Sequence, residues 1–371
     1  MKKIVLLISL IALIAVSCTE KDAFTIEGTL PDGQYNEQLV ILQAMDSTWN
    51  ARKLVNIDTA TIVDGKFTFK GLAKEGPMIH YLSLQNAPDF LKRPLMVVVE
   101  PGIIKVKMDT VSVIEGTSIN NALQALNSKS MRYDKEMRAM YEEVKKDTAN
   151  TQLKEDFEKR SEEAGKELNA DVYKLTKDNI GNQVGVYFFA SRFSGLSLDE
   201  KNELISLIDP KFKSVPMVQR SESTLATLNA TAVGKVYTDQ KTKTPDGKDI
   251  ALSDYVGKDK YVLLDFWASW CGPCIQDMPN VKKAYAEYKD KGFEIVGISL
   301  DNSNDAWKKA IEDLGITWPQ MSDLKGWESV SATAYGIQYI PQMVLIDKEG
   351  KIIDREVGGH NLAEKLGELL N

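Results

Sequence analysis

The stretch Tyr261–Pro279, YVLLDFWASWCGPCIQDMP, constrains the fold more than any other part of this sequence. It opens with an apolar run in which Asp265 is the single charged residue, a pattern typical of a central strand covered on both faces. Cys-Gly-Pro-Cys follows at 271–274, and the residues after it can form a helix. We therefore expect a buried strand that delivers two thiols to the start of a helix.

The spacing of these thiols predicts disulfide exchange. Cys271 would lie at the N-terminus of the helix, where unpaired N–H groups and the macrodipole stabilise negative charge. Such sites lower a cysteine pKa from about 8.5 toward about 7, and only a thiolate attacks a disulfide. Pro273 suits the first helical turn, where a missing N–H costs little. We predict that Cys271 is the nucleophile and that Cys274 resolves the mixed disulfide; the alternative is two reduced structural thiols.

Strands and helices alternate from residue 228 to residue 371, which indicates an α/β domain. A hairpin is expected first, between 236–240 and 250–252. The later strands are expected at 261–267, 293–299, 342–346 and 352–357, and the helices at 273–289, 305–314, 327–335 and 362–370, the last with Asn361 as its N-cap.

Residues Phe266–Cys274, with Pro279 five residues after Cys274, closely resemble thioredoxin. The additional residues between Leu300 and Ile340 make the domain similar to the TlpA/ResA branch of membrane-tethered thiol–disulfide oxidoreductases. This resemblance covers residues 228–371. It implies a thioredoxin fold, in which a central mixed sheet is flanked by helices and the cysteines lie at its C-terminal edge.

The resemblance also assigns roles to single residues. It makes Asp265 the buried carboxylate that assists proton transfer at the resolving thiol, and burial would raise its pKa. The alternative is an aspartate at a strand end that water satisfies. The lysine that often neighbours this carboxylate in thioredoxins is replaced near Gly297. Ile340-Pro341 matches the cis-proline loop, which would pair with an extended substrate chain.

The same resemblance predicts an apolar rim that receives a partner protein. Its residues would be Trp267, Trp270, Pro273, Ile340 and Gly358, with a core role favoured for Trp267 and a contact role for Trp270. Three further tryptophans, Trp307, Trp318 and Trp327, are expected in the core. His360 is expected to be exposed and without a role.

The first 18 residues predict an export signal. Lys2 and Lys3 precede an apolar run over 4–16, shorter than the about 20 residues that span a bilayer. Ala15-Val16-Ser17-Cys18 resembles a bacterial lipobox, although that motif usually has leucine at the place of Ala15. It implies a lipoprotein signal peptide at 1–17, lipidation of Cys18 and a linker at 18–23. The alternative is an ordinary secretory signal with an incidental cysteine.

Short alternating segments over 24–116 predict a β-sandwich-like domain, with the sharpest hairpin at Asp64-Gly65. The stretch resembles the N-terminal β domain that precedes thioredoxin-like domains in some envelope lipoproteins. We interpret it as a spacer or packing platform, with a partner-docking surface as the alternative. His80 has no partners for catalysis here. Residues 117–227 predict a helical region, with two long amphipathic helices that break at 147–150. Their apolar stripe fits an antiparallel hairpin or a homodimer. Shorter helices are expected at 184–193 and 198–207, and Pro210 and Pro216 are expected to interrupt the helical pattern after them.

Composition excludes several other classes. The net charge of −7 disfavours nucleic-acid binding, which needs a basic surface. The chain has three cysteines and two histidines, which are poor material for a disulfide scaffold or a zinc site. We therefore expect no metal and no cofactor.

The function expected from these observations is a lipid-anchored thiol–disulfide oxidoreductase of the cell envelope that faces the periplasm. It would reduce exported proteins, apocytochrome c among the candidates, and would receive electrons from a membrane donor. Two alternatives stay open: a thiol peroxidase of the peroxiredoxin (AhpC/TSA) type, and a binding lipoprotein that uses the fold as a scaffold.

Overall fold

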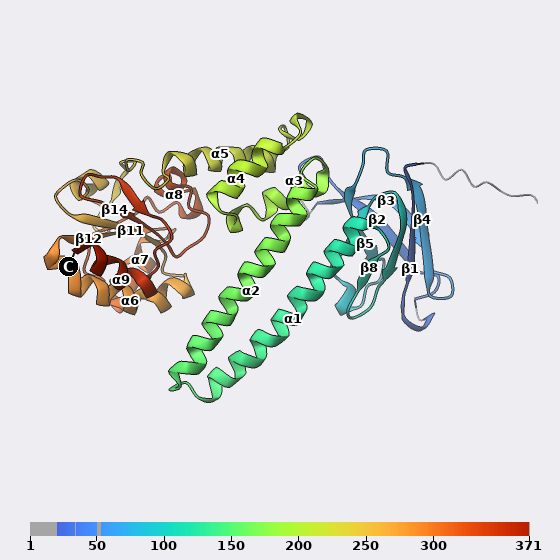
Figure 1. Ribbon diagram of the computed structural model, residues 1–371, viewed down its shortest axis with the longest axis horizontal. Coiled ribbons are helices and arrows are strands. Elements are labelled where there is room, and N and C mark those ends of the chain that lie inside the picture. The colour runs from blue at the N-terminus through green and yellow to red at the C-terminus, as the bar shows by residue number, and fades with distance from the viewer. Residues whose placement is uncertain (1–20, 34, 50–52, 371) are drawn as a thin grey trace, which may run out of the picture. The chain divides into compact units, whose positions relative to one another are not determined.

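The computed structural model describes residues 21–33, 35–49 and 53–370. The signal peptide expected at 1–17 and the lipidation site Cys18 lie outside this part of the chain. Two compact units are formed, Met1–Tyr187 and Phe188–Asn371 (Figure 1). The domain boundaries expected at 116/117 and 227/228 stay a prediction.

The first unit begins with two four-stranded sheets. In order, β4-β1-β7-β8 form one sheet and β3-β2-β5-β6 the other. The strands are β1 Ala23–Thr29, β2 Leu39–Met45, β3 Leu54–Thr61, β4 Lys66–Leu72, β5 Met78–Leu84, β6 Leu95–Val99, β7 Gly102–Lys107 and β8 Val113–Glu115. The expectation of a sheet-rich N-terminal region is confirmed.

One hydrophobic core is shared by the two sheets. Ile26 and Ile104 enter it from the first sheet, and Val40 and Leu82 enter it from the second. On β4, buried Phe67 and Phe69 alternate with exposed polar residues, as expected for strands with one covered face.

The hairpin expected at Asp64-Gly65 is only partly correct. Both residues have positive φ, and Val63 and Lys66 form a bridge across the turn. However, β3 pairs with β2, whereas β4 pairs with β1 in the other sheet. The turn therefore passes the chain from one sheet to the other, because the strands on its two sides contribute to different faces of the core.

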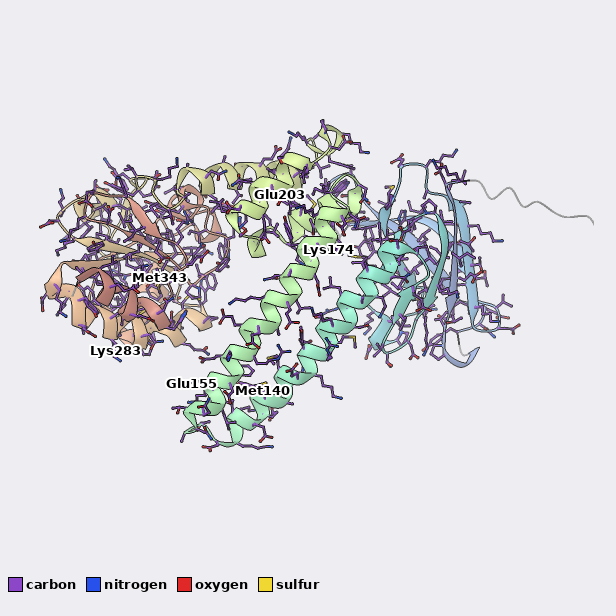
Figure 2. The ribbon with its side chains drawn as sticks, viewed as in Figure 1. Met140, Glu155, Lys174, Glu203, Lys283 and Met343 are labelled. Carbon is purple, nitrogen blue, oxygen red and sulfur yellow. A yellow bond between two sulfur atoms is a disulfide. The ribbon has the colours of Figure 1, made fainter. Side chains whose placement is uncertain are left out.

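Two long helices follow, α1 Ser118–Lys146 and α2 Thr151–Asp178, and they run side by side in opposite directions (Figure 1). The expected break at 147–150 is confirmed. In Figure 2, Met140 on α1 and Glu155 on α2 lie near the turn that joins them. The stripe thus packs within the chain; a homodimer through these helices stays a prediction.

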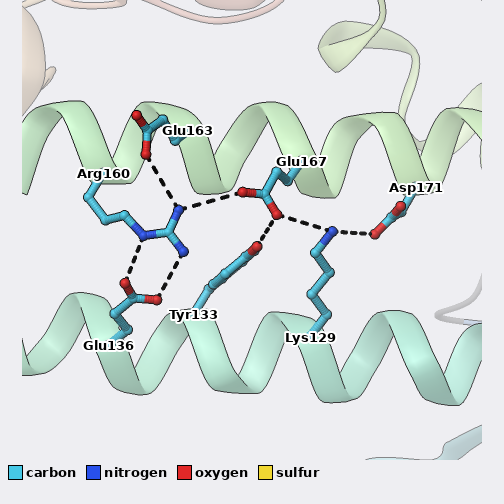
Figure 3. Close-up of polar contacts among 7 residues, drawn as sticks. All are labelled: Lys129, Tyr133, Glu136, Arg160, Glu163, Glu167 and Asp171. Carbon is cyan, nitrogen blue, oxygen red and sulfur yellow. Dashed lines mark hydrogen bonds and ion pairs between the residues drawn. The ribbon is translucent and has the colours of Figure 1, made fainter.

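Hydrogen bonds and ion pairs join α1 to α2 near the middle of this hairpin (Figure 3). Arg160 on α2 donates to both oxygens of Glu136 on α1, at 2.7 and 3.1 Å. Lys129 on α1 pairs with Asp171 at 2.7 Å, and the Tyr133 hydroxyl donates to Glu167. Tyr133 is buried while its partners are half-buried or exposed, so a polar network covers a narrow apolar seam.

The second unit contains helical residues and an α/β domain. A short helix, α3 Gln183–Ser191, runs across the border of the two units. The helices of the second unit are α4 Leu198–Leu207, α5 Pro216–Ala230, α6 Gly272–Tyr288, α7 Asn304–Leu314, α8 Val330–Tyr335 and α9 Gly359–Leu370. The expectation that Pro216 interrupts helical structure is wrong, because Pro216 opens α5, where its missing N–H is harmless.

A five-stranded mixed sheet forms the centre of the α/β domain, in the order β13-β12-β11-β14-β15. Its strands are β11 Tyr261–Trp267, β12 Phe293–Ser299, β13 Gln320–Met321, β14 Gln342–Ile346 and β15 Ile352–Asp354. A hairpin of β9 Lys241–Lys243 and β10 Asp249–Ala251 precedes it. The expectation of its first strand at 236–240 is wrong, because the residues that pair with β10 are 241–243. β11 is buried on both faces, as its apolar sequence predicts.

The last helix begins earlier than expected. α9 starts at Gly359, so Asn361 lies in its first turn instead of serving as the N-cap, and its Oδ1 accepts the N–H of Gly358. α9 packs against α6, the helix that carries the cysteines. No helix in the described residues is both long and apolar enough to cross a membrane.

Candidate active site

The two cysteines lie where β11 ends and α6 begins. Cys271 occupies the N-cap position of α6 and is joined to Cys274 by a disulfide, with 5.3 Å between their Cα atoms. The Cys271 sulfur also accepts the backbone N–H of Cys274 at 3.2 Å. After reduction, the same N–H and the helix dipole would stabilise a Cys271 thiolate.

Access to the disulfide is restricted. Cys271 is 4% exposed and Cys274 is 3% exposed, whereas Gly272 and Pro273 between them are exposed. Any molecule that reacts with either sulfur therefore has to approach over the exposed Gly272 and Pro273.

Asp265 is buried in the middle of β11, 2% exposed. Its carboxyl group has no hydrogen bond or ion pair among the described residues. Burial, and to a smaller extent the negative charge of Asp277, raises the pKa of Asp265 to about 7. A carboxyl group with such a pKa can accept and return a proton near neutral pH.

Asp277 was not predicted from the sequence, although it follows Cys274 by three residues on one face of α6. Its Oδ2 accepts the N–H of Gly359 at 2.9 Å and its Oδ1 accepts Asn280 at 3.1 Å. It therefore ties the dithiol helix to the beginning of α9, directly after Gly358, which is half-buried.

The neighbours of Asp265 on the sheet are Gly297 on β12 and Met343 on β14 (Met343 is labelled in Figure 2). A Cβ on Gly297 would lie 2.1 Å from Nε2 of Gln320, so the Gln320 side chain fills the space above this glycine. The lysine found near this position in thioredoxins is replaced, as expected, and the buried side-chain amide of Gln320 lies beside Gly297. The amide oxygen accepts Trp267 Nε1 at 2.9 Å, and the amide nitrogen has no partner among the described residues.

Asp301 holds the turn that presents the dithiol. It is 1% exposed and accepts the Ser269 N–H at 3.0 Å and the Ser299 hydroxyl at 2.7 Å. Because Ser269 is the second residue before Cys271, these bonds fix the entry of the chain into α6. Sequence reasoning missed Asp301, since its partner is thirty-two residues away in the chain.

Pro341 follows a cis peptide bond from Ile340. The next residue, Gln342, pairs with Phe266 on β11, so the cis-proline segment lies at the same end of the sheet as the dithiol. Ile340 and Pro341 are half-buried, and the segment before them belongs to no strand. Its backbone is therefore suited to pair with an added extended chain.

An exposed aromatic pair adjoins the dithiol. Trp270 is 52% exposed and Trp327 is 50% exposed, with 6.2 Å between their ring centroids. The expectation that Trp327 belongs to the core is wrong, because its 3₁₀ turn, Gly326–Glu328, turns the indole toward Trp270. Trp267, Trp307 and Trp318 are buried, as expected.

Other candidate residues lie apart from this site. His80 belongs to β5 of the first unit, and His360 is exposed in the first turn of α9. Within the described residues, no group of three or more His, Cys, Asp or Glu is arranged to hold a metal ion.

Comparison with known proteins gives matches to both parts of the chain. The Redoxin family model matches residues 228–369, and a domain of unknown function, DUF4369, matches residues 24–123. The thiol-disulfide oxidoreductase ResA of Bacillus thuringiensis subsp. konkukian is 38% identical over 125 residues, which are 34% of this chain and 69% of that protein.

A second ResA, from Halalkalibacterium halodurans, is 32% identical over 127 residues, with 34% of this chain and 69% of that protein covered. Among solved structures, the thioredoxin domain of a thiol-disulfide oxidoreductase from Bacteroides vulgatus is 36% identical, with a TM-score of 0.35. That match covers 38% of this chain and 99% of the Bacteroides domain.

Proposed function

The chain belongs to the family of ResA-like thiol–disulfide oxidoreductases, and on this premise we propose that Cys271 and Cys274 form the redox pair of an enzyme that reduces disulfides of exported proteins. The observation that carries the proposal is the Cys271–Cys274 disulfide at the N-terminus of α6, at the same sheet edge as cis-Pro341.

The proposed reaction takes two exchange steps. The Cys271 thiolate attacks one sulfur of the substrate disulfide, and the other sulfur leaves as a thiolate and takes up a proton. Cys274 then loses its proton and attacks Cys271, which releases the second substrate thiol and leaves the enzyme disulfide. Two electrons and two protons pass to the substrate, and an electron donor at the membrane restores the dithiol.

Asp265 is proposed to take the proton of Cys274 in the second step. Its pKa of about 7 suits this role, because the carboxylate is ionised often enough to accept and protonated often enough to return the proton. Trp270, Pro273, Ile340, Pro341 and Gly358 are proposed to hold the substrate chain around the dithiol.

The place of action is part of the proposal. The basic residues, the apolar run and Cys18 at the start of the chain support export and lipidation, with the enzyme facing the periplasm. Its substrates would be exported proteins with cysteine pairs, apocytochrome c among them. Residues 24–116 would then separate the redox domain from the anchor or dock a partner.

Insulin reduction tests the exchange. We expect turnover with dithiothreitol by the wild-type protein and its loss in Cys271→Ser, because no other described thiol occupies the helix N-terminus. Retention of turnover in Cys271→Ser would contradict the proposal. The reduction potential then gives the direction: about −270 mV indicates a reductase, and about −120 mV an oxidant.

The peroxidase alternative has its own control. A second cysteine three residues after Cys271 and the similarity to ResA proteins favour disulfide exchange over peroxide reduction. Peroxide consumption by Cys274→Ser at the wild-type rate would favour the peroxidase. We expect none above the uncatalysed rate.

A further inference from the structure

A cavity of about 590 Å³ lies within the second unit, apart from the disulfide. Its walls come from the beginning of α4, the end of α5, the segment around cis-Pro341 and the end of β15. The volume falls within the range of about 300–1,000 Å³ that is usual for small-molecule sites. No step of the proposed exchange uses this cavity.

Two cationic side chains line it, Lys201 from α4 and Arg355 after β15. Lys201 is 7% exposed; its ammonium donates to the Leu196 carbonyl and lies 5.2 Å from the ring centroid of Phe193. Arg355 donates to the Thr231 carbonyl at 2.8 Å and to the Tyr335 carbonyl at 2.6 Å. All of these partners are neutral.

Neither cation has a carboxylate partner within the described part of the chain. Asp354 also lines the cavity, but it is held by Lys365 at 3.7 Å and accepts two backbone N–H groups. Glu356 lines the cavity as well, but it is exposed to solvent and makes no ion pair with Lys201 or Arg355 among the described residues. Burial lowers the pKa of Lys201; the Glu200 carboxylate opposes this shift, and the charge of Arg355 adds to it. Burying two cations without a counter-charge is costly, and an anion in the cavity would offset that cost.

A third polar residue, Gln342, also lines the cavity. Its side-chain oxygen is buried and has no hydrogen-bond partner among the described residues. Buried polar groups of this kind are nearly always satisfied in folded proteins. A side-chain amide can turn to present either its oxygen or its NH₂ group, so a ligand with either kind of polar atom would satisfy it.

We propose that this cavity binds a carboxylate-bearing organic molecule, with Lys201 and Arg355 as its charge partners and Gln342 as its amide partner. Leu196, Leu228 and Ile353 supply apolar wall, which an inorganic ion would leave unused. A guanidinium and an ammonium around one pocket are the groups that recognise carboxylates best.

The carboxylate has two conceivable sources. One is a free organic acid, for which the site is independent of the exchange reaction. The other is the C-terminus of a polypeptide held at cis-Pro341, because Tyr339 and Gln342 on either side of Ile340-Pro341 both line the cavity. The second source rests on the proposed function, and the first does not.

Calorimetric titration of the full mature chain distinguishes these sources. The probes are succinate, an N-acetylated tetrapeptide with a free C-terminus, and the same peptide as its C-terminal amide. We expect one of the two carboxylate probes to bind, and Lys201→Met to weaken it about tenfold or more. Exposed Lys213→Met is the matched control and should bind as the wild type does.

Binding of succinate supports the free acid, and binding of the free-carboxyl peptide without its amide supports the polypeptide. The proposal is overturned if no probe binds up to about 10 mM, or if Lys201→Met binds as tightly as the wild type. The same titration on Cys271→Ser/Cys274→Ser protein separates this result from any failure of exchange.

A second measurement uses the wild-type protein and therefore does not depend on whether Lys201→Met folds. Acetic anhydride labels neutral amines, and peptide mass spectrometry reports each lysine. A bound carboxylate should slow the labelling of Lys201 at least threefold and leave Lys213 unchanged, since a charge-paired ammonium loses its proton less readily. Equal labelling of Lys201 with and without a saturating probe would contradict the proposal.

Discussion

A single carboxylic acid inside an apolar strand connects the stability of this protein to its proposed chemistry. Asp265 lies in β11 with Gly297 and Met343 beside it, and neither offers a cation. Desolvation is therefore the main reason for its raised pKa, and Asp277 adds a smaller electrostatic contribution. Asp265 destabilises the fold when it is ionised, and the same raised pKa is what suits it to the proposed proton transfer.

Replacing this acid should change the pH dependence of stability. Folding holds the Asp265 proton more tightly than the unfolded chain does, so wild-type stability falls as pH rises from about 4 to about 7 and is level above that. Asp265→Asn removes this loss, and we expect it to be more stable by about 2–4 kcal/mol at pH 8 and about equal at pH 4. Urea unfolding of the oxidised protein measures both.

Exposed Asp134→Asn is the control, and it should change stability by less than about 0.5 kcal/mol. An Asp265→Asn curve parallel to that of the wild type would show that Asp265 ionises normally. In insulin reduction, Asp265→Asn should also be slower near pH 7, because the resolving thiol loses its proton acceptor.

The Trp270–Trp327 pair predicts a difference between large and small substrates. Trp327→Ala removes an exposed ring next to the dithiol, so kcat/KM for insulin should fall about three- to tenfold. Reduction of a small aromatic disulfide should be unchanged, since it needs only the sulfur. Val236→Ala removes another exposed apolar side chain and serves as the control. An equal loss for both substrates would place Trp327 in the fold rather than in substrate contact.

At the scale of elements, α1 is attached to the sheets through its first turn. Glu100 accepts the N–H of Ile119 at 2.8 Å and that of Asn120 at 3.3 Å, which satisfies free donors at the helix start. The Asn120 amide bonds to both the N–H and the carbonyl of Val98 on β6. It thus covers the edge of that sheet as a neighbouring strand would.

Asn120→Ala should therefore destabilise the first unit by about 2–4 kcal/mol, because the buried N–H and carbonyl of Val98 lose their partners. Urea unfolding gives the size of the effect, and hydrogen exchange at Val98 gives its place. Exposed Asn127→Ala on the same helix should change stability by less than about 0.5 kcal/mol. Similar values for the two variants would contradict the anchoring role.

At the scale of the whole molecule, the sequence predicted most accurately the strands and helices whose ends are marked by a local sequence pattern. The bounds of β11, β12, β14 and α4 agree with expectation, because continuous apolar runs and a capping serine mark them. α5 was missed because Pro216 was interpreted as a break. Trp327 was misplaced because the size and apolarity of a tryptophan do not say which way its turn faces.

The residues that hold the elements of the candidate active site in place were the hardest to predict from the sequence. Asp301, Gln320 and Asp277 act through partners that the fold brings from other segments, namely Ser269, Trp267 and Gly359. No local pattern encodes such pairs. The dithiol itself was predictable because a thiol pair at a helix start needs only four consecutive residues.

A further prediction at this scale concerns the proposed lipid anchor at Cys18. If Cys18 is lipidated, the wild-type protein expressed in a bacterial host should enter the detergent phase of a Triton X-114 extraction. Cys18→Ser should enter the aqueous phase, since one or more acyl chains are lost. Wild-type protein in the aqueous phase would instead support an ordinary secretory signal.

The central claim is tested most directly by trapping the exchange intermediate. Reduced Cys274→Ser protein is mixed with oxidised insulin, and peptide mass spectrometry locates the bond formed. We predict a stable mixed disulfide at Cys271, which the wild type resolves and Cys271→Ser does not form. An intermediate that forms equally well at Cys274 in Cys271→Ser, or none in either variant, would contradict the account.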